Sequence, residues 1–312
     1  MKGRLIATLI LSYRIVALAS LLVLSLPSQY AHADMRYTSD LLAYTSDKHG
    51  FAEGELQPLF DRLLHDNKPL VIFIHGRGDE PSKSLEGTNA FFSFFGFEGL
   101  AVQKITAYDV NVVMVSWDSR AASRNDRERP LANMPEAQGR LAKVLDAFAR
   151  ASDATVSHVP VTLLAHSMGT IVLEKYVKEH GWQLRGITPL FSHVVLSSSD
   201  ADDKEHDKWL QIIASVERVL VTINPDDGIL GKSAKQRREI AGSRPLGRDP
   251  RESFARDATY IHIPPIGAHE IFERQPRGAR GRITTFFDAI FHGNDPQRGR
   301  QLAGVGHHFE LP

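Results

Sequence analysis

Residues 161–180 read VTLLAHSMGTIVLEKYVKEH, and this stretch decides the fold that the sequence predicts. Its first five residues form a mostly apolar run typical of a buried strand, whereas apolar side chains recur at helical spacing after Met168. Ser167 lies at the junction, with Ala165 two positions before it and Gly169 two positions after it. A tight strand-to-helix turn brings such flanking residues close together, so both must be small. The turn also pushes the serine hydroxyl into the open, at the strand end where α/β sheets gather their reactive groups.

Similar apolar runs recur along the chain and alternate with helical patterns. The runs are short and rich in Val and Ile, which is the composition of strands that helices bury on both faces. The alternation predicts an α/β fold with a doubly wound, mostly parallel sheet flanked by helices. The expected strands cover residues 70–75, 111–117, 161–165, 193–198, 218–224 and 258–263. The expected helices cover residues 56–65, 135–151, 168–180, 206–216 and 282–291.

The first 33 residues have the composition of a secretory signal peptide. Three basic side chains precede an apolar run over residues 15–26, and the segment ends in Ala-His-Ala. This order predicts cleavage after Ala33 and a secreted or periplasmic protein. The alternative is an uncleaved segment that anchors the protein in a membrane, because residues 5–11 could extend the apolar run.

Composition excludes several classes of protein. The 312 residues carry 37 basic and 37 acidic side chains, so there is no basic field and nucleic acid is not an expected partner. The chain has no cysteine, which excludes disulfides, thiolate metal sites and a cysteine nucleophile. The acidic run over residues 199–207 lacks the spacing of a calcium loop, and DDGILGKS at residues 226–233 lacks the first glycine of a phosphate-binding loop. The sequence predicts neither a metal nor a cofactor.

The motif AHSMG at residues 165–169 resembles the nucleophile elbow of the α/β-hydrolase superfamily, with alanine where the first glycine is usual. Together with SWDS at residues 116–119, it is similar to a poorly characterised bacterial group of serine hydrolases. The resemblance covers about residues 69–273. It implies the α/β-hydrolase fold, but the segment before Pro69 is short and polar, so we expect the leading antiparallel strands to be reduced.

The chain divides by composition into three parts. After the signal peptide (residues 1–33), residues 34–292 are expected to form one α/β-hydrolase domain, since no linker separates two domains. Residues 293–312 are polar and rich in glycine, which is typical of a flexible tail. His307 and His308 lie in this tail and are expected to be solvated.

The resemblance implies a catalytic triad in the chain order serine, acid, histidine. Ser167 is the expected nucleophile, although a serine at a helix start can also be a simple N-cap. Asp227 begins a D-x-x-L pattern similar to the acid turn of many family members, while Asp226 and Asp200 remain alternatives. His269 follows the last expected strand and is the expected base. His166 is expected to pack against the site or shape its pocket.

Two backbone N–H groups are expected to stabilise the oxyanion. One belongs to Met168, which follows the nucleophile. Family members with a His-Gly motif after the first core strand use the amide of the next residue, which is Arg77 here. The alternative is that the glycines in this loop form an ordinary turn.

Aromatic residues follow the expected oxyanion loop and are the main indication of the class of substrate. Phe91, Phe92 and Phe95, with two further phenylalanines nearby, could line an acyl pocket or form a lid, or they could be the buried face of a helix. We therefore expect a hydrolase that cleaves a carboxylic ester, including a lipid ester, through an acyl-enzyme. Its expected partners are a small-molecule or lipid ester and, weakly, a membrane surface. A peptidase or thioesterase with the same triad, or a binding protein that retains the fold, are the alternatives.

Overall fold

The computed structural model describes most of the chain after residue 39. The described ranges are 40–46, 49–77, 98–119, 127–155, 159–182, 190–237, 242–251, 254–274, 278–296, 301–302 and 307–311. The expected signal peptide and the residues Phe91, Phe92 and Phe95 lie outside them. Within these ranges, the structure has no helix with the length and apolar composition that a membrane span requires.

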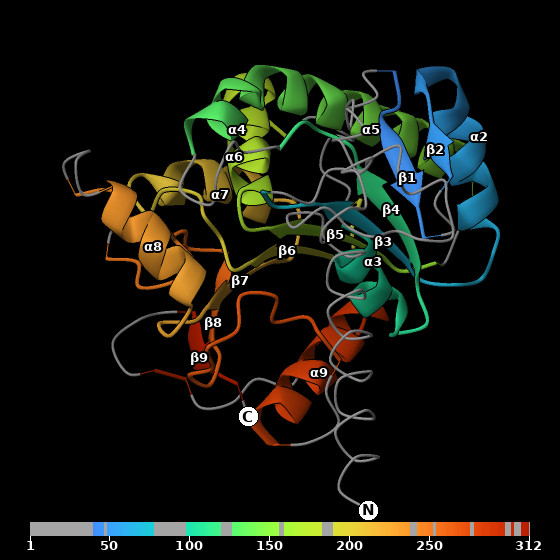
Figure 1. Ribbon diagram of the computed structural model, residues 1–312. Coiled ribbons are helices and arrows are strands. Elements are labelled where there is room, and N and C mark those ends of the chain that lie inside the picture. Colours follow the sequence, from blue (N-terminus) through green and yellow to red (C-terminus); the bar gives the residue numbers. More distant parts are fainter. Residues whose placement is uncertain are drawn as a thin grey trace, which may run out of the picture. The chain divides into compact units, whose positions relative to one another are not determined.

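A mixed, mostly parallel sheet forms the centre of the described region (Figure 1). Its nine strands have the order β2-β1-β4-β3-β5-β6-β7-β8-β9. All neighbours from β4 to β9 pair in parallel, whereas β1 and β2 pair antiparallel at one edge. The bounds are β1 Ala43–Thr45, β2 Gly50–Phe51, β3 Leu70–Ile74, β4 Asn111–Val115, β5 Val161–His166, β6 His193–Ser197, β7 Val219–Ile223, β8 Thr259–His262 and β9 His308–Glu310.

The six strands expected from the apolar runs are all present, and their ends lie within two residues of the expected ones. The leading antiparallel pair is also present but reduced to the three residues of β1 and the two of β2. Such a short edge pair fits the short, polar segment before Pro69. The predicted fold, a doubly wound and mostly parallel sheet with reduced leading strands, is confirmed.

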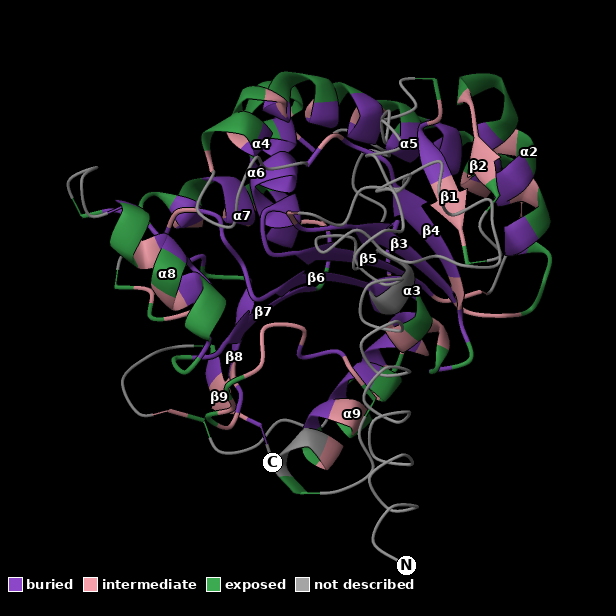
Figure 2. Cartoon of the chain, in the orientation of Figure 1, coloured by how far each residue is buried: buried purple, intermediate pink, exposed green. Residues whose placement is uncertain are grey.

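Helices cover both faces of the sheet, which explains the continuous apolar character of the strands. In β3, Ile72 and Ile74 belong to a core shared with α2, α5, α6 and α7, while Val71 and Phe73 belong to a second core shared with α3 and α9. Buried residues line the inner sides of α2, α5, α6 and α7 (Figure 2). The bounds are α2 Glu53–Leu64, α3 Glu98–Thr106, α4 Glu128–Ala132, α5 Met134–Ala154, α6 Gly169–His180, α7 His206–Ala214, α8 Gly228–Arg237 and α9 Gly278–Phe291.

The end of the chain differs from the sequence-based expectation. Residues 308–310, within the segment expected to be a flexible tail, form β9 and pair in parallel with β8. His308 is only 3% exposed, so the prediction that it is solvated was wrong. An unpaired sheet edge has free N–H and C=O groups, and β9 satisfies those of β8. The strand is three residues long and lacks an apolar run, which is why the sequence pattern did not reveal it.

Candidate active site

The serine at the end of β5 has a strained backbone. Ser167 has a φ angle of 51°, in the left-handed region that non-glycine residues rarely adopt. The helix α6 begins immediately afterwards, and a Cβ atom added to Gly169 would lie 2.3 Å from the carbonyl oxygen of Ile74 and 2.5 Å from that of His75. No larger residue can replace Gly169 without moving α6 away from β3. The Ala-x-Ser-x-Gly pattern thus forms a sharp strand-to-helix turn, in which the glycine is required by the neighbouring strand.

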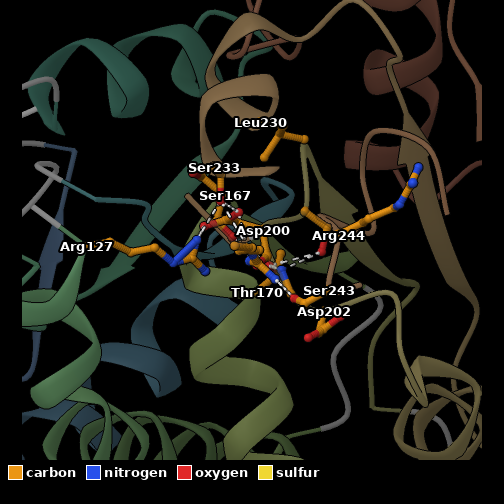
Figure 3. Close-up of polar contacts among 12 residues, drawn as sticks. Arg127, Ser167, Thr170, Asp200, Asp202, Leu230, Ser233, Ser243 and Arg244 are labelled. Atoms are coloured by element: carbon orange, nitrogen blue, oxygen red, sulfur yellow. Dashed lines mark hydrogen bonds and ion pairs between the residues drawn. The ribbon is translucent and has the colours of Figure 1, made fainter. Parts of the chain in front are cut away.

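Hydrogen bonds from the next strand and from α6 hold Ser167 in this conformation. The Ser167 N–H donates to the carbonyl oxygen of Ser197 at 3.1 Å. The Ser167 carbonyl oxygen accepts from the Asp200 N–H at 3.2 Å and from the Thr170 hydroxyl at 2.6 Å. Ser167 and Thr170 lie close to Asp200 in Figure 3. The strained residue is therefore fixed by the loop that follows β6, consistent with a functional rather than a flexible turn.

A carboxylate and an imidazole meet where the turns after β7 and β8 come together. The Nδ1 atom of His269 lies 2.7 Å from Oδ2 of Asp227. The other carboxylate oxygen of Asp227 accepts the backbone N–H groups of Ile229 and Leu230, both at 2.9 Å, at the start of α8. Asp227 and Leu230 are buried, whereas Asp226 is exposed. Of the two neighbouring acids, the one that begins the D-x-x-L pattern contacts His269.

His166 links this pair to the serine. Its ring lies against that of His269, with centroids 4.7 Å apart, and it directly precedes Ser167. Burial lowers the pKa of His166 well below its usual value, and the nearby His269 lowers it further. His166 is therefore a neutral packing group at neutral pH. It is a poor candidate for the base, and it matches the expectation that it packs against the site.

Asp200 is occupied by a different network (Figure 3). One carboxylate oxygen of this buried residue lies 2.9 Å from the Arg237 guanidinium and accepts from the Ser233 hydroxyl at 2.6 Å. The other lies 3.2 Å from the Arg127 guanidinium. Because Ser233 and Arg237 are on α8, the network attaches this helix to the loop after β6. The sequence did not indicate it, since arginines that pair with a distant acid form no local pattern.

The expected oxyanion donors lie on two adjoining segments. Met168 is the N-cap of α6, where backbone N–H groups lack partners within the helix. Arg77 is half-buried in the turn after β3, two residues beyond His75, whose carbonyl oxygen abuts Gly169. The ring of His75 stacks on Trp117, whose indole N–H donates to the His75 carbonyl at 3.1 Å. Burial lowers the pKa of His75 to about 3, so this ring is a neutral support for the loop.

Two residues that sequence reasoning did not single out also contact the His269 loop. The Ser198 hydroxyl donates to the carbonyl oxygen of His269 at 2.6 Å, and the Asn224 side chain donates to the carbonyls of Ile266 and Ala268. Asn224 ends an expected strand, and a buried polar residue at the carboxyl end of a strand was the available indication. Among the described residues, no group of three or more His, Asp or Glu side chains is arranged to hold a metal ion.

The match to a family model agrees with this fold. Residues 52–247 match the model of a family described as "Alpha/beta hydrolase of unknown function (DUF900)". Among solved structures, the chain is similar to one described as "Putative hydrolase from Agrobacterium vitis S4", with 14% identity and a TM-score of 0.36. That similarity covers 73% of this chain and 90% of the other. No curated protein matches the sequence.

Proposed function

The chain belongs to the α/β-hydrolase family of unknown function DUF900, and on that premise we propose that it is a serine hydrolase that cleaves carboxylic esters. The proposed triad is Ser167, Asp227 and His269. The observation that carries the proposal is the 2.7 Å contact between Asp227 and the Nδ1 atom of His269, beside the strained turn that presents Ser167. A carboxylate on Nδ1 directs the other ring nitrogen, Nε2, to serve as the base.

The proposed reaction begins with attack of the Ser167 hydroxyl oxygen on the carbonyl carbon of the ester. His269 takes the hydroxyl proton at Nε2, and Asp227 stabilises the imidazolium that forms. The backbone N–H groups of Met168 and Arg77 donate to the oxyanion of the tetrahedral intermediate. The intermediate collapses to an acyl-enzyme as His269 returns the proton to the leaving alcohol. Water, deprotonated by the same imidazole, then attacks the acyl carbon. The bond to the Ser167 oxygen breaks, His269 returns the proton to that oxygen, and the acid is released.

Asp227 is the proposed acid of the triad because the environments of Asp226 and Asp200 do not suit that role. Asp226 is exposed and Asp200 is engaged by two guanidinium groups and a hydroxyl. The leucine of the D-x-x-L pattern, Leu230, is 1% exposed, and its backbone N–H donates to Asp227 at the start of α8. The carboxylate that accepts two backbone N–H groups is held rigidly, which favours a fixed orientation of the imidazole.

Labelling with a fluorophosphonate probe tests the nucleophile. We expect the wild-type protein to be labelled and Ser167→Ala to fold normally, resist labelling and hydrolyse p-nitrophenyl esters at least about 10⁴-fold more slowly. Ser215→Ala is the matched control, because Ser215 is an exposed serine at the end of α7. Labelling of Ser167→Ala at the wild-type rate would refute the assignment.

A panel of p-nitrophenyl esters tests the substrate class. The proposed preference for carboxylic esters predicts hydrolysis of short and medium acyl chains, and rates that rise with chain length would extend it to lipid esters. Parallel assays with a thioester and a peptide amide measure the competing activities. A higher kcat/KM for the thioester or the amide than for every ester would contradict the proposal.

A further inference from the structure

The acid and the base of the proposed triad lie on two separate turns. Asp227 follows β7, and His269 follows β8 in a segment, residues 264–270, that has neither helix nor strand. Irregular loops open more readily than strands or helices, because fewer backbone hydrogen bonds hold them. A proton transfer between Ser167 and His269 requires the turn that carries His269 to keep its position relative to the turn that carries Asp227. Some other contact must therefore hold the loop.

Asn224 joins the two turns through a single side chain. Its Nδ2 atom donates one hydrogen bond to the carbonyl oxygen of Ile266 at 3.0 Å and a second to that of Ala268 at 2.9 Å. Its Oδ1 atom accepts the backbone N–H of Asp226 at 3.2 Å. The amide therefore uses both of its donors on the loop that carries His269 and an acceptor on the turn that carries Asp227.

The position of Asn224 gives these contacts a rigid base. It follows the last residue of β7, is 1% exposed, and its own N–H donates to the carbonyl oxygen of Gly247 at 2.8 Å. Its backbone carbonyl accepts the N–H of Asp227 at 3.2 Å. A buried side chain on the end of a central strand loses little freedom in making these bonds, so it can fix a loop that would otherwise move.

Ser198 holds the same loop from the neighbouring strand. Its hydroxyl donates to the carbonyl oxygen of His269 itself at 2.6 Å, and its backbone has a φ angle of 45°. Thr222, on β7, accepts the Ser198 N–H at 3.2 Å. The carbonyls of residues 266, 268 and 269 thus all point to donors on the ends of β6 and β7.

We propose that Asn224 is a positioning residue: its amide clamps the His269 loop to the Asp227 turn and so keeps the imidazole aligned with Ser167. The inference rests on the proposed function. Asn224 acts through His269 and touches neither the substrate nor the reacting atoms. Ser198 assists from β6 and makes the smaller contribution, since it supplies one hydrogen bond where Asn224 supplies two.

Asn224→Asp is the sharpest variant. It is nearly the same size and keeps an acceptor for the Asp226 N–H, but it replaces both donors by an oxygen that faces two carbonyl oxygens. It therefore releases the His269 loop but keeps the hydrogen bond to the Asp226 N–H in the Asp227 turn. We expect kcat for an ester to fall about 10²-fold, as for a displacement of a catalytic group by about 1 Å, with little change in KM.

The control is Thr162→Val. The Thr162 hydroxyl donates to the Ile290 carbonyl oxygen at 3.1 Å, so the variant also removes a buried bond from a side chain to a backbone carbonyl. Thr162 lies at the opposite end of β5 from Ser167. We expect this variant to lose stability and to keep the wild-type kcat per folded molecule, measured after circular dichroism has established the folded fraction.

A spectroscopic signature separates positioning from general stability. The Nδ1–H proton of His269, hydrogen-bonded to Asp227, is expected to give a downfield proton resonance in the wild-type protein and in Thr162→Val. It should broaden or disappear in Asn224→Asp. If Asn224→Asp does not fold, Ser198→Ala serves instead, with the same direction of change in kcat and in the resonance but a smaller size.

The outcomes distinguish this inference from the proposed function. A folded Asn224→Asp with unchanged kcat and an unchanged resonance overturns the clamp, as does a loss of activity that only follows the folded fraction. A wild-type protein that shows the resonance but resists the fluorophosphonate refutes the proposed function. In that case the change of the resonance in Asn224→Asp still tests whether Asn224 holds the His269 loop.

Discussion

Two groups of histidines on the same sheet show how the partner decides what an imidazole can do. In the pair at the proposed active site, His166 and His269, one ring contacts the carboxylate of Asp227. In the edge cluster, formed by His206, His262 and His308 around Tyr260, the hydrogen bonds join the rings to a phenol hydroxyl and to each other. The His206 Nε2 atom lies 3.0 Å from the Tyr260 hydroxyl, and the His262 Nε2 atom lies 2.8 Å from Nδ1 of His308.

The two groups also differ in how their rings are exposed. The side chain of His269 is 17% exposed and lies in a loop, whereas His308 is 3% exposed and stacks on Tyr260 with an interplanar angle of 16°. An imidazole that must exchange protons needs access to a substrate and an acid to orient it. An imidazole that packs needs only partners of matching shape. The proposed catalytic role therefore falls to His269, while His166 packs beside it and the edge cluster contributes to stability.

The largest expected effect comes from removing the carboxylate charge of Asp227, which contacts His269 and has no counterpart in the hydrogen bonds of the edge cluster described above. Asp227→Asn keeps an acceptor for the start of α8 but loses the carboxylate that holds the His269 Nδ1–H. We expect kcat for an ester to fall about 10⁴-fold with the fold retained. Asp226→Asn, an exposed change at the next position, is the control and should leave kcat unchanged. Equal values of kcat for Asp227→Asn and Asp226→Asn would refute the role of Asp227 as the acid that orients His269.

A smaller effect, on stability, is expected from the edge cluster. His308→Ala leaves a cavity against Tyr260 and removes the partner of His262, so we expect the free energy of unfolding to fall by about 2–4 kcal/mol. Denaturant titration measures this change, and His307→Ala, at an exposed neighbour, should show almost none. The kcat per folded molecule should stay at the wild-type value. A selective loss of kcat in His308→Ala would give the edge cluster a part in catalysis.

The smallest expected effect is a dependence of stability on pH. Burial, together with the neighbouring His262, His206 and His307, lowers the pKa of His308 to about 4. Between pH 6.5 and about 4 the unfolded chain binds a proton that the folded protein excludes, so stability falls as the pH falls. We expect this residue to account for about 2 kcal/mol of that loss.

His308→Phe isolates this contribution, because it keeps an aromatic ring in place and removes the titrating group. The free energy of unfolding of the variant, measured by denaturant titration at several pH values, should depend less steeply on pH than that of the wild-type protein. His75 and His166 are also buried with lowered pKa values, so part of the slope should remain. Identical slopes for the two proteins would contradict the assignment of a buried, neutral His308.

How far the sequence predicted the site depends on how local each feature is. The turn at Ser167 was predictable because a strand, a small residue and a helix follow each other within ten residues. The D-x-x-L pattern pointed to Asp227, and the structure pairs that residue with His269. The hydrogen bonds of Asn224 and of Asp200 were not predictable, because no local sequence pattern marks their partners. Those partners lie 42 and 44 residues from Asn224, and 33 and 37 residues from Asp200.

The sequence by itself determined the architecture. Short apolar runs rich in Val and Ile, separated by helical patterns, can bury their side chains only as a parallel sheet between two layers of helices. Only the tertiary structure decided which acid contacts His269, that residues 308–310 complete the sheet, and that Asn224 spans two turns. The physical reason is range: burial and periodicity act between near neighbours in the chain, whereas a hydrogen bond of about 3 Å between distant residues exists only after the strands have paired.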